Sequence, residues 1–406
     1  MSTVLNFPHD TSAPRTAPLS TADALALAEP VARTLAASAI ARDQAGGHAV
    51  AERELIRDSG LLALTIPVEF GGLGARWPAF YAVLRRLAQA DSALAHLFGF
   101  HHLQLAGLVL YGRPEQQQRL LRQTLTERWF WGNALNPLDK RLSATDTASG
   151  YRLDGVKSFA SGSVGSDALT LSAWHEPSHS PLIAVLPTAT PGITVHADWD
   201  AFGQRQTDSG TVSFHAVELP PELVLQAPGT TPSPRATLRS QIAQLIMANL
   251  YLGIAQGALD AGLRFNREEA RAWFQSGVAA SVDDPFVQHR YGELHLLVRP
   301  AEVLADTAAQ VLQQALDQGE ALTAAGRGAV AIAVAEAKVL AHRAAVEVSS
   351  QLFELTGARA TSARYGLDRF WRNARVHTLH DPVDYKLRDL GRHALSGEWP
   401  EPTAYS

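Results

Sequence analysis

The segment from 366 to 386 gathers more residues that could do chemistry than any other part of the chain. It reads GLDRFWRNARVHTLHDPVDYK and contains arginines at helical spacing, Trp371, and the pair His377 and His380 ahead of Pro382. Residues three apart share a helix face, so the two imidazoles can lie side by side. Pro382 is expected to end or turn the helix at that point. We interpret the segment as a candidate site on the last turn of a helix.

Two other interpretations of this segment stay open. The arginines can form a solvated helix face, with the histidines as ordinary polar residues at a helix end. An HxxH pair can also ligate a metal ion, but no HExxH motif, no cysteine and no nearby set of carboxylates completes the ligands. We therefore expect no metal here.

Length and composition narrow the functional classes. The chain has 406 residues and a formal net charge of -5, which is enough length for two or three domains and gives no basic surface for nucleic acid or an anionic membrane. The absence of cysteine excludes disulfides, thiolate nucleophiles, iron–sulfur clusters and cysteine-ligated zinc. We expect small molecules and other copies of the chain as partners.

Two further features concern the cellular setting. The N-terminus has no signal-peptide pattern, and we judge that no stretch approaches the roughly 20 apolar residues of a membrane span, so we expect a cytoplasmic protein. Besides Met1, Met247 carries the only sulfur atom. Because methionine is easily replaced in a core, this scarcity fits synthesis when sulfur is scarce, and it equally fits drift in an Ala- and Leu-rich composition.

The hydrophobic periodicity divides the chain into successive parts. Helical periods are followed by a period of two in the middle of the chain and then by long helical patterns, which predicts a mainly α protein with a central antiparallel β domain. The expected parts are a flexible arm at 1–19, an N-terminal helical domain at 20–126, a middle β domain at 127–230, a C-terminal helical bundle at 235–396 and a tail at 397–406.

Within these parts the ends of several helices are indicated by capping residues. Helices are expected at 21–45, 51–59, 77–90, 92–111, 236–269, 285–318 and 327–355. The fourth of these contains His101 and His102, and adjacent residues on a helix diverge by about 100°. We therefore expect one of the two to point inward while its neighbour faces solvent or an interface.

Five motifs carry a family resemblance. They are YGRPEQQQRLL at 111–121, GNALNP at 132–137, LDGVKSFASGSVGSD at 153–167, FGQRQTDSGTVSFHAVELP at 202–220 and RAWFQSG at 271–277. With the order of the parts, they resemble the acyl-CoA dehydrogenase superfamily over nearly the whole chain. The segments DWDAFGQRQTDSG, QLIMANLYLGIAQGALDA and DRFWRNARVHTLHDPVDYK look specifically like its reduced-flavin-dependent monooxygenases, most of all the dibenzothiophene monooxygenase group.

The resemblance implies a fold and a reaction. The fold would be an N-terminal helical domain, a β domain and a C-terminal four-helix bundle, assembled as a homotetramer with flavin near the subunit interfaces. The reaction would use reduced FMN (FMNH2), rather than FAD, and O2 through a C4a-hydroperoxyflavin. One oxygen atom would enter the substrate and the other would leave as water.

The resemblance also assigns flavin contacts position by position. Asn136 stands where relatives place a hydroxyl residue against the flavin pyrimidine ring, and Phe159 and Ser161 stand in the segment that packs on the isoalloxazine. Ser166 resembles a further contact. Arg271 matches an arginine that reaches a phosphate of flavin bound by a neighbouring subunit, a task that suits its bidentate fork.

The remaining assignments concern the chemistry. We add Trp371 to the flavin contacts and take His101, His380 and Ser166 as catalytic. Histidines equivalent to His101 and His380 lie near the reactive flavin carbon in the dibenzothiophene-type enzymes, and histidine titrates in the range that suits proton transfer. The alternative is that His101 is an ordinary core histidine.

Two departures bear on the alternatives. Acyl-CoA dehydrogenases of the commonest type place a catalytic Glu and then Gly where this chain has Asp381 and Pro382; Asp is one methylene shorter and Pro constrains the backbone differently. The chain also has no nicotinamide fingerprint, so a separate NAD(P)H-dependent flavin reductase would have to supply FMNH2.

The sequence therefore predicts a two-component flavin-dependent monooxygenase acting on a small apolar, organosulfur compound. An acyl-CoA dehydrogenase with a displaced base, an N-hydroxylating flavin monooxygenase and a non-catalytic flavin-binding protein are the alternatives.

Overall fold

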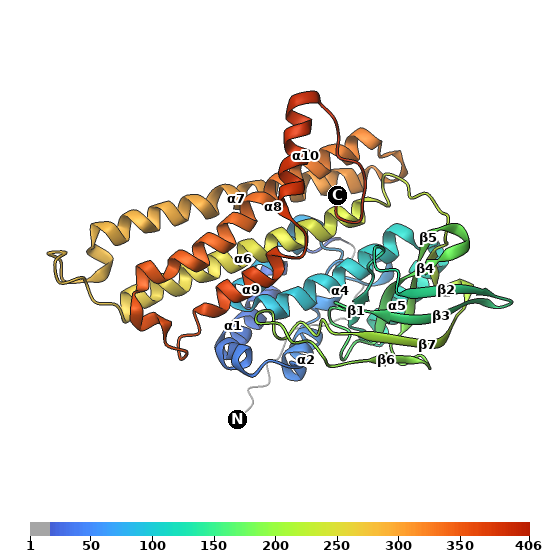
Figure 1. The fold of residues 1–406 in the computed structure, drawn as a ribbon, viewed down its shortest axis with the longest axis horizontal. Helices are drawn as coiled ribbons and strands as arrows, with labels where there is room; N and C mark the ends of the chain where they lie inside the picture. The colour runs from blue at the N-terminus through green and yellow to red at the C-terminus, as the bar shows by residue number, and fades with distance from the viewer. Residues whose placement is uncertain (1–16) are drawn as a thin grey trace.

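The structure, a computed structural model, describes residues 17–406 and has the expected three-part layout (Figure 1). Most of the arm expected at 1–19 lies outside the described residues. The long helices of the C-terminal part run side by side along the molecule, and the sheet lies at one end beside the N-terminal helices. The mainly helical architecture with a central sheet is therefore confirmed.

The N-terminal part is built from five helices. They are α1 Thr21–Ala45, α2 Val50–Asp58, α3 Trp77–Ala90, α4 Ser92–Tyr111 and α5 Pro114–Thr126. Ser20 caps α1, because its hydroxyl accepts a hydrogen bond from the backbone N–H of Asp23 at 3.1 Å. Asp91 caps α4 in the same way, accepting from Ala93 and Leu94. Helix α5 was not among the helices expected from the sequence.

The middle part is one sheet whose strands are not all antiparallel. The strands are β1 Trp131–Ala134, β2 Leu142–Thr147, β3 Gly150–Lys157, β4 Ala168–His175, β5 Ser180–Pro187, β6 Ile193–Val195, β7 Val212–Leu219 and β8 Val224–Gln226. They pair in the order β6-β7-β3-β2-β4-β5-β8, and β1 pairs with β4. Both β1 and β2 run parallel to β4, which corrects the antiparallel expectation. The β2–β3 hairpin lies between β1 and β4 in sequence, and this crossover makes the parallel pairing possible.

The C-terminal part is a helical bundle. It contains α6 Leu238–Glu268, α7 Pro285–Asp317, α8 Ala324–Thr356, α9 Asp368–Thr378 and α10 Val383–Ser396. Helix α6 also packs on α3, and Gly253 allows the close approach, since a Cβ there would lie 2.5 Å from that of Ala88 and 2.8 Å from the carbonyl oxygen of Arg85. Pro382 is the N-cap of α10, so α9 ends before it.

Helix α4 lies inside the molecule, between α3, α6 and β1, and nearly all of its residues are buried. His101 and His102 both have no exposed surface. The expectation that one of them faces outward is therefore wrong, because neighbouring elements cover every face of this helix.

Three helices, α1, α4 and α6, are long and apolar enough to cross a membrane by length and composition alone. This corrects the judgement that no stretch comes near a membrane span. In the fold, 94% of the apolar window of α4 and 83% of that of α6 are buried, against 33% for α1. The long apolar segments of α4 and α6 therefore pack in the protein core.

Candidate functional site

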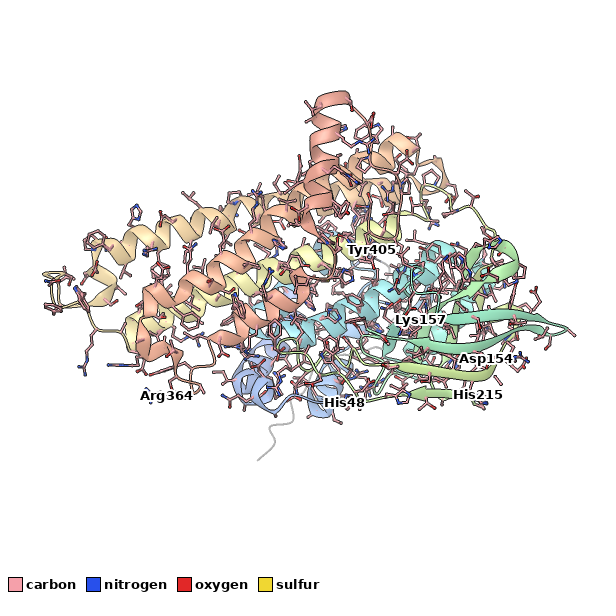
Figure 2. All side chains as sticks on the ribbon, in the orientation of Figure 1. His48, Asp154, Lys157, His215, Arg364 and Tyr405 are labelled. Atoms are coloured by element: carbon pink, nitrogen blue, oxygen red, sulfur yellow. The ribbon has the colours of Figure 1, made fainter. Side chains whose placement is uncertain are left out.

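A cavity of about 500 Å³ lies where the helical bundle meets the β domain. Residues from four regions line it: helix α4, helix α6, strand β1 with the loops around the sheet, and the C-terminal end of α9 with the segments that follow α9 and α10. Figure 2 shows Tyr405 and Lys157 at this junction; Tyr405 lines the cavity, and the Lys157 ammonium donates to the backbone oxygen of the lining residue Asn136 at 2.9 Å. Burial lowers the pKa of Lys157 to about 8.

Three of the expected flavin contacts, Asn136, Phe159 and Ser161, line this cavity. Phe159 has a positive φ of 55° and is 71% exposed, and its ring lies 6.0 Å from that of Trp199, which also lines the cavity. The Ser161 hydroxyl is 2.9 Å from that of Ser209. This wall offers aromatic faces and small hydroxyls to a ligand.

One residue of this wall also carries an unpartnered polar atom. Gln204 lines the cavity, and its buried Oε1 has no hydrogen-bond partner among residues 17–406. A flat heteroaromatic ring with N–H groups on its edge would satisfy such an acceptor. The wall therefore fits an isoalloxazine, and Asn136, Phe159, Ser161 and Gln204 are the residues that would hold it.

Three other expected site residues do not line the cavity of this chain. The Ser166 hydroxyl donates to the backbone oxygen of Ser163 at 2.8 Å. Trp371 stacks on Phe202 with ring centroids 6.1 Å apart. Arg271 is exposed on the loop between α6 and α7, where its backbone pairs with Ala280. The role expected for Arg271 in a neighbouring subunit stays a prediction.

His101 is also outside the cavity, and both of its ring nitrogens have backbone partners. Its Nε2–H donates to the carbonyl oxygen of Leu62 at 2.9 Å, and its Nδ1 accepts from the backbone N–H of Trp131 at 3.1 Å. Burial lowers the pKa of His101 to about 3. This geometry favours the alternative of a core histidine, because both ring nitrogens already have backbone partners. The catalytic role expected of His101 stays a prediction.

The cavity histidine of α4 is His96, which sequence reasoning missed. It stacks on Phe100 at 4.0 Å and lies 4.7 Å from the His377 ring. Neither of its ring nitrogens has a hydrogen-bond partner in the described part of the chain. Burial, with the nearby His377 and His380, holds the pKa of His96 well below its usual range. His96 is therefore neutral and offers one donor and one acceptor to a ligand.

His377, on the last turn of α9, and His380, two residues beyond the end of that helix, both line the cavity. His377 is buried, its Nδ1 has no partner among residues 17–406, and burial lowers its pKa to about 3. The side chain of His380 is 41% exposed, and its Nδ1 lies 3.0 Å from a carboxylate oxygen of Asp381. This contact makes Nδ1–H the donor and leaves Nε2 free.

Asp381 itself is not a lining residue but the centre of a buried ion pair. Its carboxylate also accepts from the ammonium of Lys338, which is buried in α8 and reaches the side-chain oxygen of Gln244. Burial raises the pKa of Asp381, but the hydrogen bond from His380 and the charge of Lys338 outweigh burial and hold that pKa well below its usual range. A carboxylate occupied in this way is not poised to remove a substrate proton.

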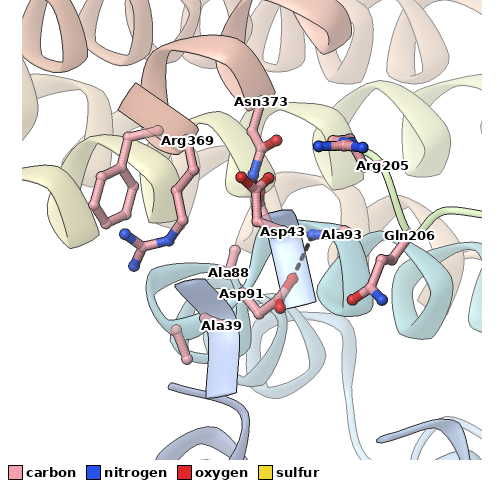
Figure 3. Close-up of a pocket in the computed structure, with 12 residues that line it drawn as sticks. Ala39, Asp43, Ala88, Asp91, Ala93, Arg205, Gln206, Arg369 and Asn373 are labelled. Atoms are coloured by element: carbon pink, nitrogen blue, oxygen red, sulfur yellow. Dashed lines mark hydrogen bonds between the residues drawn. The ribbon is translucent and has the colours of Figure 1, made fainter. Parts of the chain in front are cut away.

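A second, much smaller cavity lies between α1, α3, α4 and α9 (Figure 3). Its volume is about 20 Å³, which suits a single water molecule. Asp91, which is hydrogen-bonded to Ala93 in Figure 3, pairs with Arg42 at 2.7 Å, so the charges here hold helices together. Across the described chain, no group of three or more His, Cys, Asp or Glu side chains is placed to hold a metal ion.

Comparison with known proteins identifies the family. Models of the N-terminal and C-terminal domains of acyl-CoA dehydrogenase match residues 22–128 and 245–385. A probable FMNH2-dependent monooxygenase, SfnC of Pseudomonas putida, is 46% identical, covering 94% of this chain and 97% of its own. The crystal structure of methanesulfinate monooxygenase MsuC from Pseudomonas fluorescens is also 46% identical, with a TM-score of 0.92 and coverage of 94% and 99%.

A third relative was crystallised with its cofactor. FMN-bound TdsC, a dibenzothiophene monooxygenase from Paenibacillus sp. A11-2, is 40% identical, with a TM-score of 0.91 and coverage of 94% and 100%. These relatives favour FMN as cofactor and monooxygenation over the acyl-CoA dehydrogenase alternative. The chain therefore belongs to the FMNH2-dependent monooxygenases of the acyl-CoA dehydrogenase superfamily.

Proposed function

We propose that this protein uses FMNH2 and O2 to insert one oxygen atom into a small organosulfur compound held in the cavity at the junction of the bundle and the β domain. The observation that carries the proposal is the cavity itself, which combines a wall suited to a flavin ring with three histidines, His96, His377 and His380. Bound FMNH2 supplies the electrons that activate O2, and the protein positions and shields the reacting groups.

The roles of the chain's own residues follow from their surroundings. Neutral His96, whose ring nitrogens have no partner among residues 17–406, offers an N–H donor and a nitrogen acceptor to the reacting atoms. His380 lines the cavity and is partly exposed, and because its Nδ1 contacts Asp381, its Nε2 is free to pass a proton between the cavity and solvent. Phe100, Leu103 and Met247 form an apolar wall that excludes water.

The wider setting is also part of the proposal. The chain has no nicotinamide fingerprint, so a separate NAD(P)H-dependent flavin reductase supplies FMNH2. We further propose a cytoplasmic homotetramer, in which Arg271 on its exposed loop reaches the flavin phosphate of a neighbouring subunit. The exposed position of Arg271 and its neighbours Trp273 and Phe274 supports a contact with another copy.

The test of the site compares two buried histidines of α4. His96→Gln should lower kcat by about 100-fold or more, because a group that faces the reacting atoms is lost, and should leave stability almost unchanged, because no hydrogen bond is broken. His101→Gln should instead lower the free energy of unfolding by about 1–3 kcal/mol through its two backbone hydrogen bonds. Product is measured with FMNH2 from a flavin reductase, and stability by urea unfolding.

The outcomes separate the two assignments. If kcat falls only in His101→Gln, and this variant keeps its full stability, the catalytic role belongs to His101. If neither substitution changes product formation, the histidines are not part of the chemistry. Failure of the unsubstituted protein to form any oxygenated product from organosulfur compounds with FMNH2 and O2 would remove the proposed function.

A further inference from the structure

One charged residue stands out in the cavity wall. Arg239, on the first turn of α6, is only 7% exposed and lines the cavity together with Ala243 and Met247, which lie four and eight residues further along the same helix face. The described lining contains no Asp, Glu or Lys. Among the described lining residues, Arg239 is therefore the one side chain that carries a permanent charge.

Among the described residues, the guanidinium of Arg239 has one hydrogen-bond partner, and that partner is a neutral side chain. Its Nη2–H donates to the side-chain oxygen of Gln104 at 3.0 Å, and Gln104 in turn donates to the backbone oxygen of Phe100 at 3.0 Å. Its Nε has no partner in the described chain, and no carboxylate of residues 17–406 forms an ion pair with it. Gly107 makes room for the group, because a Cβ there would lie 3.0 Å from Nε.

This arrangement is unfavourable without a ligand. An arginine stays protonated in proteins, and burying its charge without an anion costs free energy. The position makes the cost larger, because the start of a helix carries the positive end of the helix dipole, and the first turn of α6 has no acidic residue. Gln104 holds the guanidinium in place without neutralising its charge. An anion bound in the cavity would neutralise that charge and remove the cost.

We propose that Arg239 binds the anionic group of the substrate, so that the cavity selects an organic sulfinate over neutral organosulfur compounds. The inference rests on the proposed function and narrows it to one substrate class. Among organosulfur oxyanions, a sulfinate keeps a lone pair on sulfur to accept oxygen, whereas a sulfonate does not. The balanced reaction is RSO2⁻ + O2 + FMNH2 → RSO3⁻ + FMN + H2O, in which sulfur and FMNH2 each supply two electrons.

The flavin phosphate is the other possible source of an anion. The residues suited to the flavin ring, such as Asn136 and Phe159, come from the β domain, whereas Arg239 lies in the helical wall with Phe100 and Leu103. This separation favours the substrate. The two sources are distinguished by measuring FMN affinity and sulfinate affinity on the same variants.

The experiment measures binding by calorimetry to the FMN-loaded protein. Methanesulfinate is compared with dimethyl sulfoxide, a neutral molecule of similar size, in the unsubstituted protein and in Arg239→Gln, Arg239→Lys and Arg122→Gln. Arg122 is exposed on α5 and serves as the matched control. We expect methanesulfinate to bind and dimethyl sulfoxide not to, with Arg239→Gln weakening methanesulfinate by about 10- to 100-fold, Arg239→Lys weakening it less, and Arg122→Gln having no effect.

Two results would overturn the inference. One is equal binding of methanesulfinate and dimethyl sulfoxide by the unsubstituted protein, a comparison that needs no variant to fold. The other is a loss of FMN affinity in Arg239→Gln with sulfinate binding intact, which would assign Arg239 to the flavin phosphate. Arg239-dependent binding without any sulfonate formed from FMNH2 and O2 would instead support the anion site and count against the proposed function.

Discussion

At the scale of single residues, the orientation of the His380 ring depends on the buried ion pair of Asp381 and Lys338. Asp381 is shared between His380 and the buried Lys338, so its removal has two effects. Asp381→Asn should lower the free energy of unfolding by about 3–5 kcal/mol, because Lys338 is left as an unpaired buried charge. It should also lower kcat, because the neutral amide oxygen of Asn is a weaker acceptor for the Nδ1–H of His380 than the carboxylate is. Urea unfolding and steady-state turnover measure the two effects.

The matched control is Asp58→Asn at the end of α2, whose exposed carboxylate pairs with the exposed Arg128. Such a pair contributes about 1 kcal/mol or less. A double substitution, Lys338→Met with Asp381→Asn, should recover much of the stability but not the turnover. Recovery of both would show that Asp381 acts on the fold alone and does not orient His380.

The residue scale is also where the sequence was least informative. A histidine's role depends on the direction of its side chain. On a half-exposed helix, the spacing of the apolar residues shows which side chains face the core. Helix α4 is apolar on every face, so the period could not tell His96, which lines the cavity, from His101, which has backbone partners. By contrast, the motifs around Asn136 and Ser161 carried the family resemblance, and both residues line the cavity; their contacts with the flavin stay a prediction.

At the scale of elements, the approach of α6 to α3 depends on the absence of a side chain at Gly253. Gly253→Ala places a Cβ within 2.5 Å of that of Ala88, and we expect it to lower the free energy of unfolding by about 1–3 kcal/mol through overpacking. Gly391→Ala in α10 is the control, because nothing lies within 4 Å of a Cβ there. Gly391→Ala should be neutral or stabilising by up to about 1 kcal/mol.

Equal effects of the two alanines on urea unfolding would mean that α6 and α3 can move apart at little cost. A large loss confined to Gly253→Ala would confirm the close contact. The same variant should also reduce turnover, since α6 carries the cavity wall that includes Met247.

Helix ends were predictable from local chemistry, whereas strand partners were not. The ends of α1, α3 and α4 agree with the sequence because Ser20 and Asp91 cap two of these helices and Pro78 stands in the first turn of the third. The period of two revealed the strands but not the parallel pairing of β1 with β4. That pairing is set by contacts distant in sequence, which a local pattern does not contain.

At the scale of the whole molecule, buried neutral histidines make stability sensitive to acid. Burial lowers the pKa values of His101 and His377 to about 3 and holds those of His96 and His102 well below the usual range. In the unfolded chain these groups take up protons below about pH 6.5. The unfolded state then binds more protons than the folded one, so the free energy of unfolding falls as pH falls from about 6.5 towards 3.

We expect urea midpoints that are nearly constant from pH 8 to 7 and that fall steeply below pH 6.5. Each of these histidines adds about 1.4 kcal/mol per pH unit to the slope. The substitution His102→Gln should remove one such contribution, measured as a shallower slope between pH 6 and 5. A stability profile that is flat to pH 5 would mean that the histidines are protonated in the fold.

The position of Met247 has a practical consequence. Met247 carries the single sulfur atom of the chain apart from that of Met1, and it is buried in the wall of the cavity in which we propose that oxygen is activated. A thioether accepts one oxygen atom to become a sulfoxide. Mass spectrometry of the peptide that contains Met247 would therefore measure the fraction of this residue converted to sulfoxide. That fraction reports how often turnover without substrate transfers oxygen to the protein.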